Sequence, residues 1–280
     1  MTAFKKILGL VLFSTGALFS IASQAEETLE VETRQPEALT AYTQTPLPAL
    51  LPHEAMYFVA GSGPDEDVKA RFQFSFKYRL LEEASEYVQR HPWMGRLHLA
   101  YTQTSLWNWS ADSVPFEDTS YQPSLFFELQ NTPVAPVLSL GYFHESNGED
   151  GEESRSLDTL FVQPVWAGRF LDRDFYLMPR FFAYINKGSQ NPDITDYRGH
   201  ADIILRYGNE DGLILTSLYR YGHGGRHTLQ LDASHPIRMP IAWRTGGFVF
   251  IQAFSGYGES LLTYDQRVDF TLRVGLGIVR

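Results

Sequence analysis

A histidine and a serine stand two residues apart in the segment GYFHESNGEDGEESRSLDTLF, which runs from Gly141 to Phe161. The residues before them alternate like a half-buried strand, with Leu138 and Leu140 on one face. His144 and Ser146 continue this apolar face, where an aliphatic side chain would be expected. An imidazole and a hydroxyl on one face have the composition of a general base and its nucleophile.

The residues that follow can bring a carboxylate next to this pair. In a hairpin centred on Gly151, positions 144 and 158 lie equally far from the turn and therefore opposite each other. Opposed residues on one face have Cβ atoms about 4.5–5.5 Å apart, so we expect Asp158 beside His144 and diagonal to Ser146. Ser146 would attack, His144 would take its proton, and Asp158 would orient the ring. The pattern also fits polar residues that merely take hydrogen bonds near a strand end.

The rest of the chain after about residue 54 also repeats with a period of two, which predicts strands almost without interruption. In RFQFSFKYRL, for example, aromatic residues from Phe72 to Tyr78 alternate with polar ones. No stretch has the pattern of a long amphipathic helix. We expect twelve strands, near residues 54–61, 68–80, 94–108, 121–131, 135–147, 156–167, 175–187, 197–207, 212–221, 225–235, 245–262 and 267–279.

The polar faces of these strands suggest where the strands lie. They carry many charged residues, and aromatic residues gather near the strand ends, as in the girdles of membrane barrels. Several strands reach the length of about ten residues with which a tilted strand crosses a membrane. The predicted fold is therefore all-β, a twelve-stranded antiparallel transmembrane β-barrel. On the pattern alone, a soluble β-protein remains the alternative.

Composition and the N-terminal segment point to export. Lys5 and Lys6 precede an apolar run, and Ser23-Gln24-Ala25 resembles a signal-peptidase site. We therefore expect a signal peptide over residues 1–25, a polar, proline-bearing arm over 26–52 and the barrel over 53–280. The chain has no cysteine, so disulfides contribute nothing. Its formal charge of −10, or −12 without the two lysines, argues against nucleic acid as a partner.

Several uncommon strings occur together along the chain. They are HESNG and SRS with Asp158 two positions later, YTQTS at 101–105, a Ser-x-Pro-Phe at 113–116, NPDIT at 191–195 and SGYGESL at 255–261. In these strings the sequence resembles the outer-membrane phospholipase A family of Gram-negative bacteria. The resemblance implies a barrel with its active site on the outer surface. It also implies calcium-dependent hydrolysis of phospholipid and lysophospholipid acyl esters (A1/A2 type) by a homodimer.

The same resemblance assigns roles to individual residues. It makes Ser146 the nucleophile and His144 the base, while Asp158 stands where the best-known members have asparagine. The main-chain amide of Gly148 would stabilise the oxyanion. Calcium would be held by the Ser154 hydroxyl, the main-chain carbonyl of Glu149 and the carbonyl of the partner subunit's Ser113. Gln103, a polar residue on an apolar face, would pair across the dimer interface.

Two other classes of function remain possible at this stage. A non-catalytic outer-membrane barrel, such as a small channel or a structural protein, could keep these residues by descent. A soluble secreted β-domain that binds lipid or sugar has little left to support it.

Overall fold

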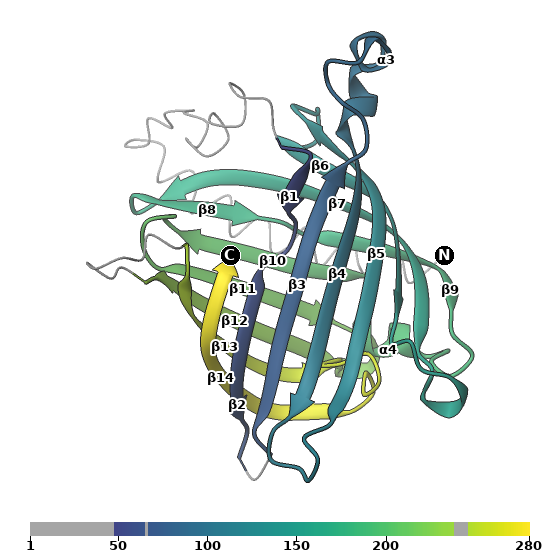
Figure 1. Cartoon of the computed structure of the whole chain (residues 1–280), viewed down its shortest axis with the longest axis vertical. Helices are drawn as coiled ribbons and strands as arrows, with labels where there is room; N and C mark the ends of the chain where they lie inside the picture. The colour runs from purple at the N-terminus through teal and green to yellow at the C-terminus, as the bar shows by residue number, and fades with distance from the viewer. Residues whose placement is uncertain (1–47, 65–66, 238–245) are drawn as a thin grey trace, which may run out of the picture. The chain divides into compact units, whose positions relative to one another are not determined.

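Antiparallel strands make up most of the part of the protein that the structure describes (Figure 1). The structure is a computed structural model that describes residues 48–64, 67–237 and 246–280. Its strands are β1 Leu50–Pro52, β2 Met56–Ser62, β3 Lys69–Arg79, β4 Leu97–Asn108, β5 Phe116–Gln130, β6 Val137–Ser146, β7 Ser156–Phe170, β8 Arg173–Leu177, β9 Arg180–Lys187, β10 Ala201–Gly208, β11 Ile214–Tyr221, β12 His227–Pro236, β13 Phe248–Tyr257 and β14 Arg267–Val279.

These strands close into a barrel with twelve strand positions. Each position is called a stave, whether one strand or two consecutive short strands occupy it. From β2 onward, consecutive strands pair with each other except β8 and β9, and β14 returns to pair with β2. β8 and β9 follow one another along a single stave between β7 and β10. The staves are thus β2 to β7, the β8–β9 pair and β10 to β14, which confirms the predicted twelve-stranded barrel. β1 adds three residues to β3.

The seventh stave differs from its prediction, which was one strand over residues 175–187. The ladder is interrupted at Met178 and Pro179, between β8 and β9. Proline has no N–H to donate to a ladder, and it is found at strand starts and irregularities for this reason. The alternation of side chains gave no sign of the interruption.

The alternation places apolar side chains outside and polar ones inside. On β14, Leu272, Val274 and Leu276 are 45–58% exposed, whereas Arg273 between them is 1% exposed. On β3, Phe74 is exposed and Ser75 is completely buried. A sheet that turns apolar residues outward and buries its charges is suited to hydrocarbon as its surroundings.

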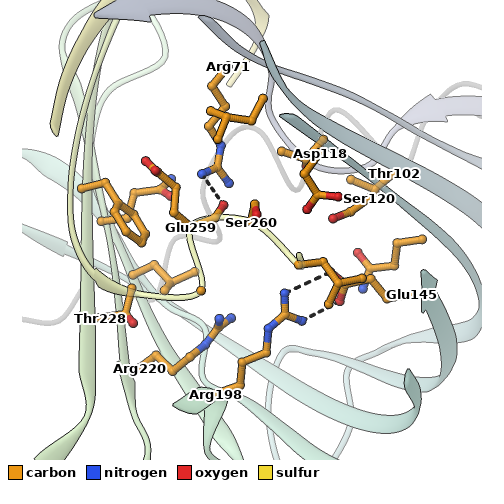
Figure 2. A pocket seen from close by; sticks show the side chains of 18 residues that line it. Arg71, Thr102, Asp118, Ser120, Glu145, Arg198, Arg220, Thr228, Glu259 and Ser260 are labelled. Carbon is orange, nitrogen blue, oxygen red and sulfur yellow. Dashed lines mark hydrogen bonds and ion pairs between the residues drawn. The ribbon is translucent and has the colours of Figure 1, made fainter. Parts of the chain in front are cut away.

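The buried charges pair with one another inside the barrel (Figure 2). Arg198 meets Glu145 at 2.6 Å, and Arg220 meets Asp202 at 2.6 Å. Arg71 donates to the main-chain carbonyl of Glu259 at 2.9 Å. Two polar cavities of about 140 and 270 Å³ remain between these side chains. Such pairing compensates for the removal of each charge from water.

Short helices lie in the connections. They are α3 Glu86–Arg90 and the 3₁₀ turn η1 Pro92–Arg96 between β3 and β4, η2 Gly151–Glu153 between β6 and β7, α4 Ile194–Arg198 between β9 and β10, and η3 His223–Gly225 between β11 and β12. Ile194 of α4 and Leu261 of the β13–β14 loop are completely buried in an apolar cluster that includes Phe143 and Leu157. In the described part of the chain, no helix has both the length and the apolar character needed to cross a membrane.

The expected signal peptide, residues 1–25, lies outside the described residues, and so does most of the expected arm over 26–52. The last residues of that arm form β1, where Leu50 pairs with Tyr78 of β3.

Candidate functional site

The pair His144 and Asp158 forms the centre of the candidate site. The register of β6 and β7 sets His144 opposite Asp158, as the hairpin centred on Gly151 predicts. Nδ1 of His144 lies 2.8 Å from Oδ1 of Asp158. An ionised carboxylate can only accept hydrogen bonds, so Nδ1 carries the proton and Nε2 is left as the basic nitrogen.

Ser146 lies two residues further along β6, on the same outward face as His144. It pairs with Ser156 of β7 on one side and with Tyr121 of β5 on the other. Ser146 is half-buried, and in the described structure its hydroxyl takes part in no intramolecular hydrogen bond. The structure therefore places the three candidate residues on one face and joins two of them. Hydrogen bonds of a catalytic serine are often loose before substrate binds.

Two residues that sequence reasoning missed also contact Asp158. The hydroxyl of Tyr142 donates to Oδ1 at 2.6 Å, and the side-chain amide of Asn186 on β9 donates to Oδ2 at 3.2 Å. The parity of β6 could have identified Tyr142, because it stands on the same face as His144. Asn186 lies 28 residues from Asp158 along the chain and carried no sequence signal.

The β6–β7 loop is organised by Asn147, which is 3% exposed. Its side-chain oxygen accepts from the amide of Arg155 at 2.9 Å and more weakly from that of Glu149 at 3.4 Å. Its Nδ2 donates to the carbonyl of Glu153 at 2.8 Å. Gly148 follows with a φ of 75°, in the left-handed region that favours glycine. The loop next to Ser146 is thus fixed by one buried side chain.

The loop offers oxygen atoms of the kind that calcium prefers. Within the described residues, the Ser154 hydroxyl and the Glu149 carbonyl make no intramolecular hydrogen bond, and both residues reach the surface. No group of three His, Asp or Glu side chains that could hold a metal occurs in residues 48–64, 67–237 and 246–280. A cation at this loop would therefore depend on hydroxyl, carbonyl and water oxygens, and the residues present fit that donor set.

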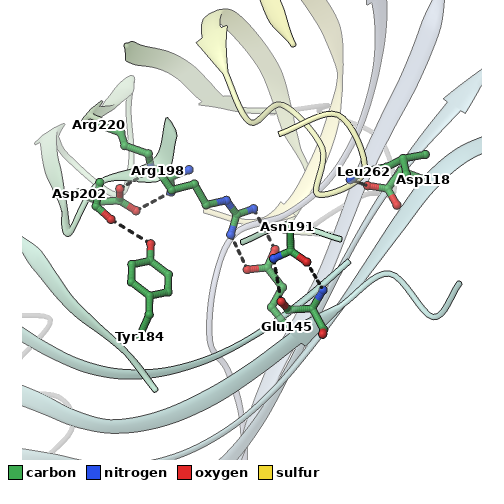
Figure 3. A network of polar contacts seen from close by, with 10 residues as sticks. Asp118, Glu145, Tyr184, Asn191, Arg198, Asp202, Arg220 and Leu262 are labelled. Atoms are coloured by element: carbon green, nitrogen blue, oxygen red, sulfur yellow. Dashed lines mark hydrogen bonds and ion pairs between the residues drawn. The ribbon is translucent and has the colours of Figure 1, made fainter. Parts of the chain in front are cut away.

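Asn191 supports the site from inside the barrel and is completely buried. Its side chain accepts from the amide of Ser156 at 3.1 Å and donates to the carbonyl of the same residue at 2.9 Å (Figure 3). Since Ser156 pairs with Ser146, this double contact fixes the start of β7 opposite the candidate nucleophile. Asn191 stands in the NPDIT string, for which the sequence suggested no role.

Gln103 and Ser113 lie on neighbouring elements. Gln103 of β4 pairs with Tyr121 of β5, which in turn pairs with Ser146, so the three form one row across the outer face. The hydroxyl of Tyr101 donates to Oε1 of Gln103 at 2.9 Å. Ser113 is exposed in the β4–β5 loop with a φ of 66°. β4 and β6 run in the same direction, so this loop and the β6–β7 loop lie at the same end of the barrel.

Comparison of the sequence with known proteins gives consistent matches. The model of the family described as phospholipase A1 matches residues 24–279. A putative phospholipase A1 of Neisseria meningitidis is 29% identical over 230 residues, which are 78% of this chain and 56% of that protein. Phospholipase A1 of Escherichia coli K12 is 29% identical over 195 residues, 65% of this chain and 61% of that protein. The chain thus spans less than two thirds of the length of these relatives.

Solved structures show the same fold. The outer membrane phospholipase A from Escherichia coli superposes with a TM-score of 0.68 at 24% identity, over 82% of this chain and 98% of that one. A Salmonella typhi outer membrane phospholipase dimer with bound calcium gives 0.68 at 22% identity, over 86% of this chain and 96% of that one. Since the family model covers nearly the whole sequence, the chain belongs to the phospholipase A1 family.

Proposed function

We propose that this protein is a calcium-dependent phospholipase of the bacterial outer membrane that works as a homodimer. Its substrates would be phospholipids and lysophospholipids, whose acyl esters it would hydrolyse at either position (A1/A2 type). The observation that carries the proposal is the His144–Asp158 pair, which lies beside Ser146 on the outward, lipid-facing surface of the barrel. A substrate dissolved in water would instead require a site that faces water.

The chemistry follows from the protonation state of His144. Nε2 accepts the proton of the Ser146 hydroxyl as its oxygen forms a bond to the ester carbonyl carbon. The imidazolium then gives this proton to the leaving lysolipid oxygen, and the C–O bond breaks to leave an acyl-enzyme. Water, deprotonated by His144, releases the fatty acid and restores Ser146. Asp158 holds the ring through both halves of the reaction.

The developing negative charge needs donors beside Ser146. The amide of Gly148 is the candidate, because Gly148 is an exposed residue two positions after Ser146, in a loop that Asn147 fixes. Calcium bound by Ser154, the carbonyl of Glu149 and the partner subunit's Ser113 would supply further stabilisation of that charge. The acidic residues of the loop would raise the local concentration of the cation.

A dimer fits the placement of Gln103. A side-chain amide on a lipid-facing surface is stabilised by a polar partner, and a second Gln103 across an interface would be one. The row Gln103–Tyr121–Ser146 would bring such an interface close to the nucleophile. We further propose that residues 1–25 are removed as a signal peptide, that 26–52 form an arm and that 53–280 form the barrel.

Hydrolysis by purified protein tests the proposal. Fatty-acid release from mixed phospholipid–detergent micelles is measured for wild type and Ser146→Ala, each with calcium and with a chelator. We expect activity only for wild type with calcium, and a loss of at least about a thousandfold for Ser146→Ala. Sedimentation of the same samples should show more dimer with calcium than with chelator. Ser217→Ala, at another outward-facing serine, is the matched control and should retain full activity.

Equal inactivity of folded, dimeric wild type and Ser146→Ala in calcium would overturn the enzymatic proposal. The alternative, a non-catalytic barrel, would then account for the protein.

A further inference from the structure

Asp158 accepts three hydrogen bonds, and all three donors are side chains. His144 Nδ1 and the Tyr142 hydroxyl share Oδ1 at 2.8 and 2.6 Å, while Nδ2 of Asn186 reaches Oδ2 at 3.2 Å. The three come from two different strands, since Tyr142 and His144 belong to β6 and Asn186 belongs to β9. The side chain of Asp158 is 24% exposed on the lipid-facing surface.

A β-bulge brings Asn186 to this position. Thr159 pairs with Tyr184, so a regular ladder would set Asp158 opposite Ile185. The register instead shifts by one residue, and Asp158 pairs with Asn186. Ile185 and Asn186 are consequently both exposed, although neighbours in a strand normally point to opposite faces. Bulges next to active sites often re-aim a side chain in this way.

Building on the proposed function, we propose that Asn186 and Tyr142 are positioning residues of the hydrolytic site: they hold the Asp158 carboxylate against Nδ1 of His144. Neither residue touches the reacting atoms. Tyr142 keeps Oδ1 directed at the ring, and Asn186, turned outward by the bulge, fixes Oδ2 and so the plane of the carboxylate.

The electrostatics explain why a carboxylate here needs both donors. An ionised group at a lipid boundary is costly unless hydrogen bonds replace its water, and charge-assisted bonds do so best. A cationic neighbour would compete with the imidazolium for the same carboxylate. Tyr142 and Asn186 are neutral, so they solvate Asp158 and leave its full charge to stabilise protonated His144 during the reaction.

An exchange of Asp158 and Asn186 tests the direct contact. Asn186→Asp alone sets two carboxylates face to face, and we expect kcat to fall at least about a hundredfold with little change in KM. Adding Asp158→Asn restores one acceptor and one donor across the contact. The kcat of the double variant should therefore recover to within about tenfold of that of wild type. Such non-additive effects are expected for two residues in direct contact. Asp158→Asn alone should lower kcat less than Asn186→Asp does, because the side-chain amide of Asn186 can turn its oxygen toward the new amide at position 158.

Tyr142→Phe removes one hydrogen bond to a charged group and should lower kcat about tenfold at unchanged KM. Tyr219→Phe, at an exposed tyrosine on β11, is the matched control and should behave like wild type. Circular dichroism and heat-dependent mobility on gels establish that each variant is a folded barrel.

The outcomes separate this inference from the proposed function. If wild type releases fatty acid but the double variant is no more active than Asn186→Asp, the positioning role is wrong and the proposed hydrolytic function is unaffected. Full activity of Asn186→Asp would equally overturn the role. If wild type itself is inactive, both proposals fall together.

Discussion

His53 shows how one half-buried residue makes the stability of this barrel depend on pH. It lies between β1 and β2, half-buried, with its ring stacked on Phe126 at a centroid distance of 5.1 Å. Burial lowers the pKa of His53 from 6.5 to about 4, with Glu54 and Glu128 opposing the change and Arg180 and Lys77 adding to it. The folded protein therefore keeps this ring neutral at a pH where the unfolded chain binds a proton.

This difference predicts a loss of stability in acid. As the pH falls from about 6.5 to about 4, the unfolded state binds a proton at His53 that the folded state does not bind. The free energy of unfolding therefore decreases. His53→Phe retains an aromatic ring against Phe126 but has no group that titrates. Over this pH range we expect its free energy of unfolding to decrease by about 1–3 kcal/mol less than that of wild type. Urea unfolding in detergent at several pH values measures the change.

His223→Phe is the control for this experiment, because His223 is exposed in the loop that contains η3. Parallel pH dependences of His53→Phe and wild type would contradict the prediction.

Residue by residue, the sequence predicted the part of the site that obeys strand parity. His144, Ser146 and Asp158 follow from alternation and from one hairpin centre, so their placement was within reach. Asn186 was not, since a register shift at Ile185 reverses its face and leaves no mark in the pattern. Tyr142 stands between Leu140 and His144 on the same strand face, where a tyrosine is compatible with an apolar surface and does not by itself indicate a polar contact.

At the scale of elements, Gly141 governs how closely β5 and β6 approach. A Cβ on Gly141 would overlap the carbonyl oxygen of Leu125 and the backbone of Phe126, and neither can move aside by a rotamer change. The strand that carries His144 and Ser146 is thus held tightly against its neighbour. Gly168 on β7 is different, because a Cβ there would meet nothing within 4 Å.

This contrast supplies a matched pair of variants. Gly141→Ala should destabilise the barrel by about 1–3 kcal/mol, as other overpacked positions do, and should reduce hydrolysis because it separates Tyr121 from Ser146. Gly168→Ala should change neither property. Urea midpoints and fatty-acid release measured side by side test both expectations, and equal midpoints for the two variants would contradict them.

The elements themselves were largely predictable because most strands cross in one nearly regular, alternating run. Two features were not. The stave of β8 and β9 reads as one strand, since Pro179 interrupts the ladder without disturbing the alternation around it. α3 falls between two predicted strands and η1 overlaps the start of the strand predicted near 94–108, and five residues each are too few for a helical period to show.

At the scale of the whole barrel, the interior is filled by charge pairs and by inward loops. Arg198 of α4 is paired with Glu145 of β6, and Arg180 of β9 reaches Glu54 at 2.7 Å. Leu261 and Ile194 add a buried apolar cluster from two loops. Wide pores keep a continuous polar channel, whereas the cavities here are about 140 and 270 Å³.

We therefore expect the wild-type protein to show no porin-sized conductance in planar lipid bilayers. A 16-stranded porin in the same apparatus is the positive control. Regular ohmic steps of comparable size from this protein would contradict the closed interior and would favour the alternative of a small channel.

The β-bulge at Ile185 has a consequence for the life of the protein before it reaches its membrane. Asn186 meets Asp158 only once β9 has joined β7, and the β6–β7 hairpin alone leaves the carboxylate without that support. Under the proposed function, an incompletely assembled chain would lack the geometry needed to attack lipids. A lipid-degrading enzyme built this way would stay inactive until it is inserted in its membrane, and its hydrolytic activity would indicate that the barrel is fully assembled.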